Sequence, residues 1–193
     1  MPITASFKAV LCCLALAGLT LAAGCDSPEY PEVVHSHDRD LVSVDVQALD
    51  AVVQSATSQG KVAVVEVWAT WCAPCIDLIP LMKKAAHDRG DKMQLISLSV
   101  DGPEDAGQAK TTLKQLEKDI SKEFGIHAHL LDNAYILPNP EHQQALLGDS
   151  IAPPTVFIYG TDGKLFKRID GSDANSLIGE ITQAIDDAIA AAG

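Results

Sequence analysis

The chain has 193 residues, of which 47% are hydrophobic and 21% charged, and this composition excludes disorder over most of its length. Fourteen Lys and Arg against 26 Asp and Glu give a formal net charge of −12. That charge argues against nucleic acid as a partner and against electrostatic docking on anionic lipid, because both need a surface rich in Lys and Arg. The length suits one domain with an additional segment at one end.

The first 24 residues have the pattern of a secretion signal. Lys8 is their only charged residue, and an apolar stretch with small residues at its end follows from Ala9. A buried helix of the domain is the alternative, but this segment lacks a polar face. Its end, LAAGC at residues 21–25, resembles a bacterial lipoprotein signal, in which the cysteine is lipidated and becomes the first residue. The usual pattern has Leu where this chain has Ala22, with Leu21 one position earlier.

The cysteine count favours lipidation of Cys25 over ordinary cleavage that leaves a free thiol. Cys12 and Cys13 leave with the signal, and a bridge between Cys72 and Cys75 leaves Cys25 alone in an oxidising compartment. We therefore expect a signal over residues 1–24, a polar tether over 25–40 and one domain over 41–193. The expected location is outside the cytoplasm, anchored to the cell membrane by lipid, on the periplasmic side of the inner membrane if the cell is Gram-negative.

From residue 41 the pattern predicts alternating helices and strands. One expected helix follows a cap at Asp45 and stops at Gly60, and three others run over 72–87, 111–124 and 141–147. The last expected helix follows a cap at Ser172 or Asp173. Expected strands cover 61–68, 93–100, 155–159 and 165–169, with a turn at 161–163 between the last two. The β-branched run KVAVVEVW at 61–68 predicts a strand buried on both faces. This order predicts an α/β fold whose mixed sheet is flanked by helices.

One motif carries chemistry: two cysteines, Cys72 and Cys75, enclose Ala73 and Pro74 between a buried strand and a helix. The amides and dipole of a helix N-terminus stabilise an anion, so we expect Cys72 to be exposed, to have a lowered pKa and to attack disulfides as a thiolate. Cys75, one turn later, is placed to attack the resulting mixed disulfide. A structural bridge and half of a zinc site are the alternatives, and a zinc site would want a second ligand pair.

The run WATWCAPC at 68–75 resembles the active site of the thioredoxin superfamily. Together with SVDG at 99–102 and PTVFIYGTDGKLFKRIDG at 154–171, the chain from about residue 41 to 193 is most similar to membrane-anchored thiol-disulfide proteins of the TlpA/ResA type. The resemblance implies a thioredoxin-like fold with an insertion between residues 101 and 150. It also implies that the Cys72–Cys75 disulfide is the redox centre, with no separate cofactor and no metal.

The same resemblance assigns roles around the two cysteines. Glu66, six residues before Cys72, corresponds to a carboxylate that accepts and returns the proton of the second thiol, and burial should raise its pKa. Pro154 corresponds to a cis-proline that faces the disulfide. The residues expected to orient the substrate are Trp71, Ala73, Pro74, Pro153, Pro154 and Thr155.

Two positions depart from the family pattern. Pro153 precedes the expected cis-proline and has no N–H, so one backbone bond to a docked substrate is missing. Thioredoxins also place a Lys near the buried carboxylate on the neighbouring strand, where this chain has Ser97 and Ser99. Both departures predict differences in substrate docking and proton handling.

The expected function is thiol-disulfide exchange with protein substrates outside the cytoplasm, in the direction of reduction, as in cytochrome c maturation. Electrons would come from a membrane thiol donor, and we expect a monomer. An oxidase or isomerase is one alternative. A lipoprotein that uses a redox-inactive thioredoxin fold only to bind a partner is another.

Overall fold

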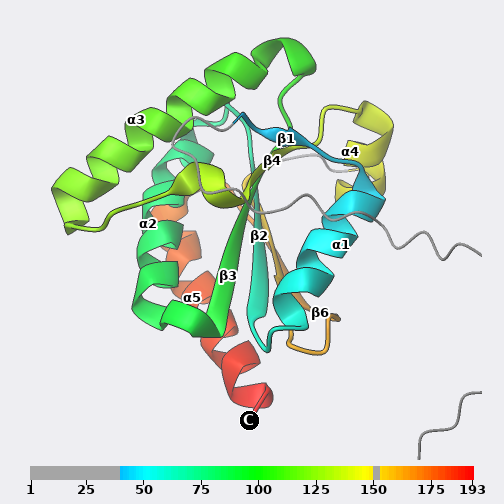
Figure 1. Cartoon of the computed structure of the whole chain (residues 1–193), viewed down its shortest axis with the longest axis vertical. Helices are drawn as coiled ribbons and strands as arrows, with labels where there is room; N and C mark the ends of the chain where they lie inside the picture. The colour runs from blue at the N-terminus through cyan, green and yellow to red at the C-terminus, as the bar shows by residue number, and fades with distance from the viewer. Residues whose placement is uncertain (1–39, 150–152) are drawn as a thin grey trace, which may run out of the picture. The chain divides into compact units, whose positions relative to one another are not determined.

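A central six-stranded sheet organises the domain (Figure 1). The computed structural model describes residues 40–149 and 153–193. The strand order is β1-β4-β3-β2-β5-β6. The strands are β1 (Val42–Ser43), β2 (Val62–Trp68), β3 (Met93–Ser99), β4 (Ala134–Ile136), β5 (Thr155–Tyr159) and β6 (Leu165–Asp170). The first four in that order are parallel, whereas β5 runs antiparallel to both β2 and β6, so the sheet is mixed.

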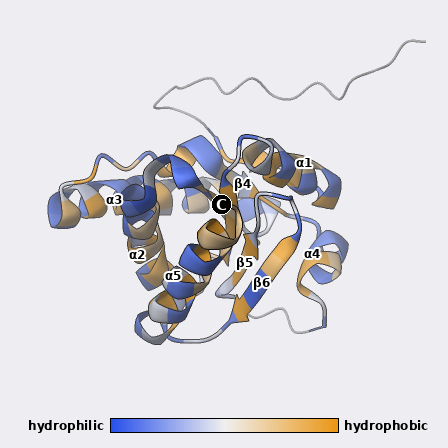
Figure 2. Cartoon of the chain, turned by 90° about the horizontal axis from the view of Figure 1, so that it is seen from below, coloured by the Kyte–Doolittle hydropathy of each residue, from blue (hydrophilic) through white to orange (hydrophobic). Residues whose placement is uncertain are grey.

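Helices cover both faces of the sheet. They are α1 (Val46–Thr57), α2 (Ala73–Arg89), α3 (Ala106–Phe124), α4 (Pro140–Leu147) and α5 (Ala174–Ala191). The apolar residues of α1 and α3 form one core cluster with Val65 and Val67 of β2. Leu78 and Met82 of α2 form a second cluster with α5 and with Val62 and Val64 of β2. In Figure 1, α1 lies on the right of the strands and α2 and α5 on the left, and Figure 2 shows α1 and α3 toward the top with α2 and α5 below them.

Every helix and strand expected from the sequence is present, and the largest difference in bounds is the start of α3. All seven residues of β2 are buried, as its β-branched run predicts. The Asp45 carboxylate accepts a hydrogen bond from the Ala48 amide at 2.7 Å and caps α1, and Asp173 rather than Ser172 caps α5. Gly125 ends α3 in the left-handed conformation, with φ of 68°.

The region 101–150 contributes more regular structure than the sequence predicts. α3 begins at Ala106 rather than Thr111, and β4 joins the sheet beside β3. β1 pairs with β4 at the edge. The segment regarded as an insertion therefore supplies a strand of the central sheet, and it extends the sheet on the side of β3. The expected signal, the tether and Cys25 lie outside the described residues.

Candidate active site

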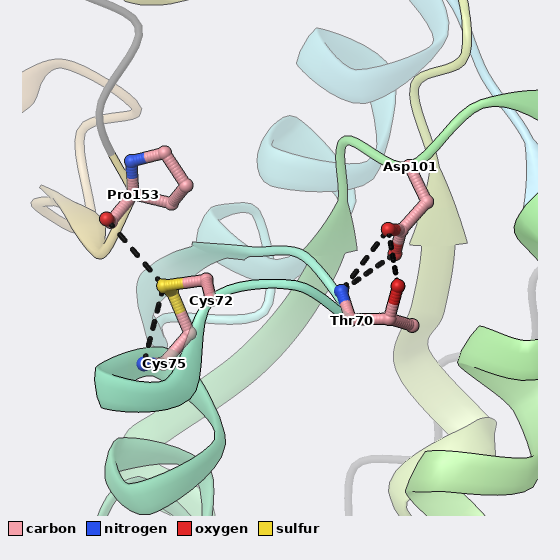
Figure 3. Close-up of a disulfide and its surroundings, with 5 residues drawn as sticks. All are labelled: Thr70, Cys72, Cys75, Asp101 and Pro153. Atoms are coloured by element: carbon pink, nitrogen blue, oxygen red, sulfur yellow. Dashed lines mark hydrogen bonds between the residues drawn. A yellow bond between two sulfur atoms is a disulfide. The ribbon is translucent and has the colours of Figure 1, made fainter.

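The two motif cysteines form a disulfide at the start of α2 (Figure 3). Cys72 is the residue that caps this helix, and the Cys75 amide donates a hydrogen bond to its Sγ at 3.3 Å. Pro74 lies in the first turn, where a missing N–H leaves no helical bond unmade. After reduction the same amide would face the Cys72 sulfur, and a thiolate there would be stabilised by the helix N-terminus.

A buried carboxylate holds the loop that leads from β2 to this helix. Asp101 is 1% exposed and accepts bonds from the Thr70 amide at 3.0 Å and the Thr70 hydroxyl at 2.7 Å, as Figure 3 shows. The Ser99 hydroxyl donates to the same carboxylate at 2.7 Å. Thr70 is two residues before Cys72, so Asp101 fixes the approach of the chain to the disulfide. The sequence motifs predict no role for Asp101, although an acidic residue directly after an apolar strand is a usable signal.

The loop before β5 meets the disulfide from the other side. The Pro153–Pro154 peptide bond is cis, as the resemblance implied. The Pro153 carbonyl oxygen is 3.5 Å from Cys72 Sγ. In the disulfide this sulfur has no proton to donate, whereas a reduced Cys72 thiol can donate to that carbonyl. Pro154 is buried, and the hydroxyl of Thr155, which is also buried, donates to Asp170 at 2.7 Å and links β5 to β6.

Glu66 is fully buried in the middle of the sheet. It lies on β2 between Ser97 of β3 and Val156 of β5, and the alternation of side chains places it with Val64 on the face covered by α2 and α5. Neither carboxylate oxygen has a hydrogen-bond partner among the described residues. Burial raises the pKa of Glu66 to about 8, because a charged carboxylate loses its hydration there. A carboxyl whose pKa lies close to that of a thiol suits a group that accepts the proton of a thiol and returns it.

The remaining expected residues differ in exposure. Trp71 is 66% exposed next to the disulfide, Ala73 is exposed and Pro74 is half-buried. Cys72 is only 5% exposed, so the expectation of an exposed nucleophile is wrong. The Pro153 carbonyl oxygen, 81 positions away in the chain, contacts its sulfur, in the loop that the resemblance had placed against the disulfide.

The described part of the chain offers no group of three or more His, Cys, Asp or Glu side chains arranged to hold a metal ion. None of its helices combines the length and the apolar character that crossing a membrane requires.

Known proteins are similar to the part of the chain that carries the two cysteines. The thioredoxin family model matches residues 29–114. A thioredoxin from Listeria monocytogenes is 36% identical over 59 residues, which are 30% of this chain and 56% of the relative. The thiol-disulfide oxidoreductase ResA from Bacillus subtilis is 25% identical over 122 residues, which are 62% of this chain and 59% of ResA. The chain therefore spans a little over half the length of these curated relatives.

Solved structures match over more of the chain. A thiol:disulfide interchange protein of the thioredoxin family from Chlorobium tepidum superposes with a TM-score of 0.51 at 19% identity, over 80% of this chain and 99% of that structure. The chain has a thioredoxin fold. A secreted disulfide oxidoreductase from Mycobacterium tuberculosis shares the thioredoxin fold, with a TM-score of 0.50 at 17% identity over 68% of this chain and 85% of that structure.

Proposed function

We propose that this protein is a thiol-disulfide oxidoreductase that reduces disulfides of protein substrates outside the cytoplasm. The observation that carries the proposal is the Cys72–Cys75 disulfide at the start of α2, with the Cys75 amide directed at Cys72 Sγ. That arrangement favours attack by Cys72 as a thiolate. The family match and the relatives named as thioredoxin and ResA support the same chemistry.

In the proposed cycle the disulfide itself is the redox group. The Cys72 thiolate attacks one sulfur of a substrate disulfide, and the other substrate sulfur leaves as a thiolate. Cys75 gives its proton to ionised Glu66 and attacks Cys72, which restores the Cys72–Cys75 disulfide and releases the second substrate sulfur. Two electrons pass from the protein to the substrate. We propose that a membrane thiol donor then reduces the Cys72–Cys75 disulfide again. Trp71, Ala73 and the loop from Pro153 to Thr155 would line the docked substrate.

Trapping tests the order of the two cysteines. Cys75→Ser removes resolution and leaves attack intact, so mixed disulfides with cellular proteins should accumulate through Cys72 and survive non-reducing electrophoresis. Cys72→Ser should trap roughly tenfold less, because the fully buried Cys75 lacks the helix-terminus field. The reverse pattern would exchange the assigned roles. Trapping by neither variant would leave a binding module as the better account.

The trapped proteins decide the direction of the reaction. Apocytochromes among them would support reduction in cytochrome c maturation. A diverse set of secreted proteins would favour an oxidase or isomerase instead. The reduction potential of the Cys72–Cys75 pair, measured against glutathione, would separate a reductase from an oxidase or isomerase.

The location outside the cytoplasm and the lipid anchor rest on the sequence of residues 1–25. We predict that the mature chain begins at a diacylated Cys25 and partitions into the detergent phase on extraction. Cys25→Ala should leave the chain uncleaved or release it in soluble form, with the Cys72–Cys75 pair still able to reduce disulfides. Mass spectrometry that finds an unmodified Cys25, or cleavage at another residue, contradicts the anchor without touching the proposed chemistry.

A further inference from the structure

Four buried polar atoms in the described residues have no hydrogen-bond partner there, and they gather on two adjacent strands. One is the indole nitrogen of Trp68 at the carboxyl end of β2. The other three are both carboxylate oxygens of Glu66 and the hydroxyl oxygen of Ser97. Leaving a buried polar group unpaired destabilises the folded state, so a concentration of such groups needs a physical reason.

Glu66 and Ser97 are direct neighbours across the sheet. They are register partners of the parallel pair β2 and β3, so their side chains leave the sheet on the same face. Adjacent strands lie about 4.8 Å apart, which brings a carboxyl and a hydroxyl within reach of a single bridging water. Ser97 is 5% exposed and Glu66 is fully buried, so this bridge would be closed to bulk solvent.

Ser97 is the polar residue directly opposite Glu66, and the next buried polar groups along β2 and β3 are the Trp68 indole nitrogen and the Ser99 hydroxyl, which donates to Asp101. The buried residues that α2, α5 and the flanking strands place on this face are apolar, namely Leu78, Met82, Leu177, Ile181, Val64 and Val156. The titratable groups at this end of the sheet are Cys75, which is held in the disulfide, and Asp101, whose carboxylate is bonded to Ser99 and Thr70. Burial alone accounts for the raised pKa of Glu66, without a charged neighbour.

We propose that Ser97, through one buried water, binds the Glu66 carboxyl and positions it for the exchange of its proton with Cys75. A hydroxyl and a water can each donate and accept, so the bridge donates to Glu66 when it is ionised and accepts from it when it is protonated. In the resolving step the Cys75 S–H bond breaks and an O–H bond forms on Glu66. The Cys75 electron pair forms the bond to Cys72, the bond between Cys72 and the substrate sulfur breaks, and that sulfur leaves as a thiolate. Ser97 is a positioning residue in this step, and the inference rests on the proposed function.

The matched pair Ser97→Thr and Ser97→Val tests the proposal, because the two side chains have the same shape and only Thr keeps the hydroxyl. The readout is the pKa of Glu66 from the carboxyl ¹³C resonance in the oxidised protein, where the cysteines do not titrate. A donor to the ionised form lowers a pKa, so Ser97→Val and Ser97→Ala should raise that of Glu66 by at least about half a unit. Ser97→Thr should restore it to the wild-type value.

Ser99→Ala is the control, because it removes a buried hydroxyl from the same strand whose bond is to Asp101. It should leave the Glu66 titration unchanged. An unchanged Glu66 titration in both Ser97→Val and Ser97→Ala overturns the proposal, as does a shift of equal size in Ser97→Thr.

A kinetic readout separates this inference from the proposed function. The rate at which Cys75 resolves a mixed disulfide with glutathione should rise through the pKa of Glu66, and Glu66→Gln should abolish that inflection. In Ser97→Val the inflection should move upward together with the titration. An inflection that persists in Glu66→Gln refutes the proton role of Glu66. An inflection that is lost in Glu66→Gln but unmoved in Ser97→Val refutes the role of Ser97 alone.

Discussion

At the scale of single residues, Glu66 couples the stability of the protein to pH. Its carboxyl stays protonated in the folded state up to a pKa of about 8, whereas the ordinary pKa of an exposed Glu is 4.5. Between these values the unfolded chain binds fewer protons than the folded one. Stability should therefore fall as pH rises, by about 1.4 kcal/mol per pH unit, and level off above pH 8.

Glu66→Gln tests this coupling because it keeps the shape of the side chain and cannot ionise. Urea denaturation of the oxidised protein between pH 5 and 8 should show the slope in the wild type and a flatter dependence in Glu66→Gln. Glu141→Gln, at the exposed start of α4, should behave like the wild type. Equal slopes in the wild type and in Glu66→Gln would mean that Glu66 is ionised in the folded protein.

The residue-level chemistry was predictable only as far as local patterns reach. The cysteine pair, the burial of Glu66 and the cis bond before Pro154 follow from a motif or from a resemblance carried by contiguous residues. The contact between Cys72 and the Pro153 carbonyl and the bonds from Thr70 to Asp101 join residues 81 and 31 positions apart. Contacts at such separations depend on the packed fold, so a pattern of neighbours does not contain them.

At the scale of elements, the same distinction separates what was predicted from what was not. β2 has a long apolar run and was found within a residue of its expected bounds, and α1 has a cap with regular spacing and begins directly after the expected cap, Asp45. β1 and β4 have two and three residues, too few for a period to show. The first turn of α3 contains only Ala109 as a buried residue, and its weak apolar stripe concealed the start of the helix.

The junction between β6 and α5 leads to a prediction about packing. A Cβ atom at Gly171 would lie 2.5 Å from Leu177 Cδ2 and 2.9 Å from its Cγ, and Leu177 is a buried residue of α5. Gly171→Ala should therefore displace Leu177 from the core and destabilise the protein by about 1–3 kcal/mol.

Gly179→Ala, inside α5, is the control. A Cβ atom there meets nothing within 4 Å, and alanine favours a helix over glycine by about 1 kcal/mol, so this variant should be more stable than the wild type. Thermal unfolding followed by circular dichroism shows whether each variant is more or less stable than the wild type. Two variants that change stability in the same direction would show that α5 is not packed as described.

At the scale of the whole molecule, the mixed sheet brings distant segments to one end. Cys72 follows β2, Asp101 follows β3 and Pro153 precedes β5, and these three strands are neighbours in the sheet. Because β5 runs antiparallel to β2, its beginning lies beside the end of β2. The candidate active site is therefore a product of topology, assembled where two parallel strands end and an antiparallel strand begins.

That topology also predicts where the chain can be shortened. A chain that begins at Asp40 retains β1 and the ion pair between Asp40 and Lys110, at 2.6 Å, and should unfold at the wild-type temperature. A chain that begins at Asp45 loses β1, the buried Val44 and its amide bond to the Ile136 carbonyl at 2.9 Å. Its free energy of unfolding should fall by about 2 kcal/mol, because one apolar side chain and a strand pairing are removed from the β4 edge.

Both chains keep Cys72, Asp101 and Pro153, so their rates of glutathione disulfide reduction should match at a temperature where both are folded. A chain from Asp40 that unfolds well below the wild type would place part of the domain core before residue 40, and a chain from Asp45 as stable as the wild type would make β1 dispensable for the sheet.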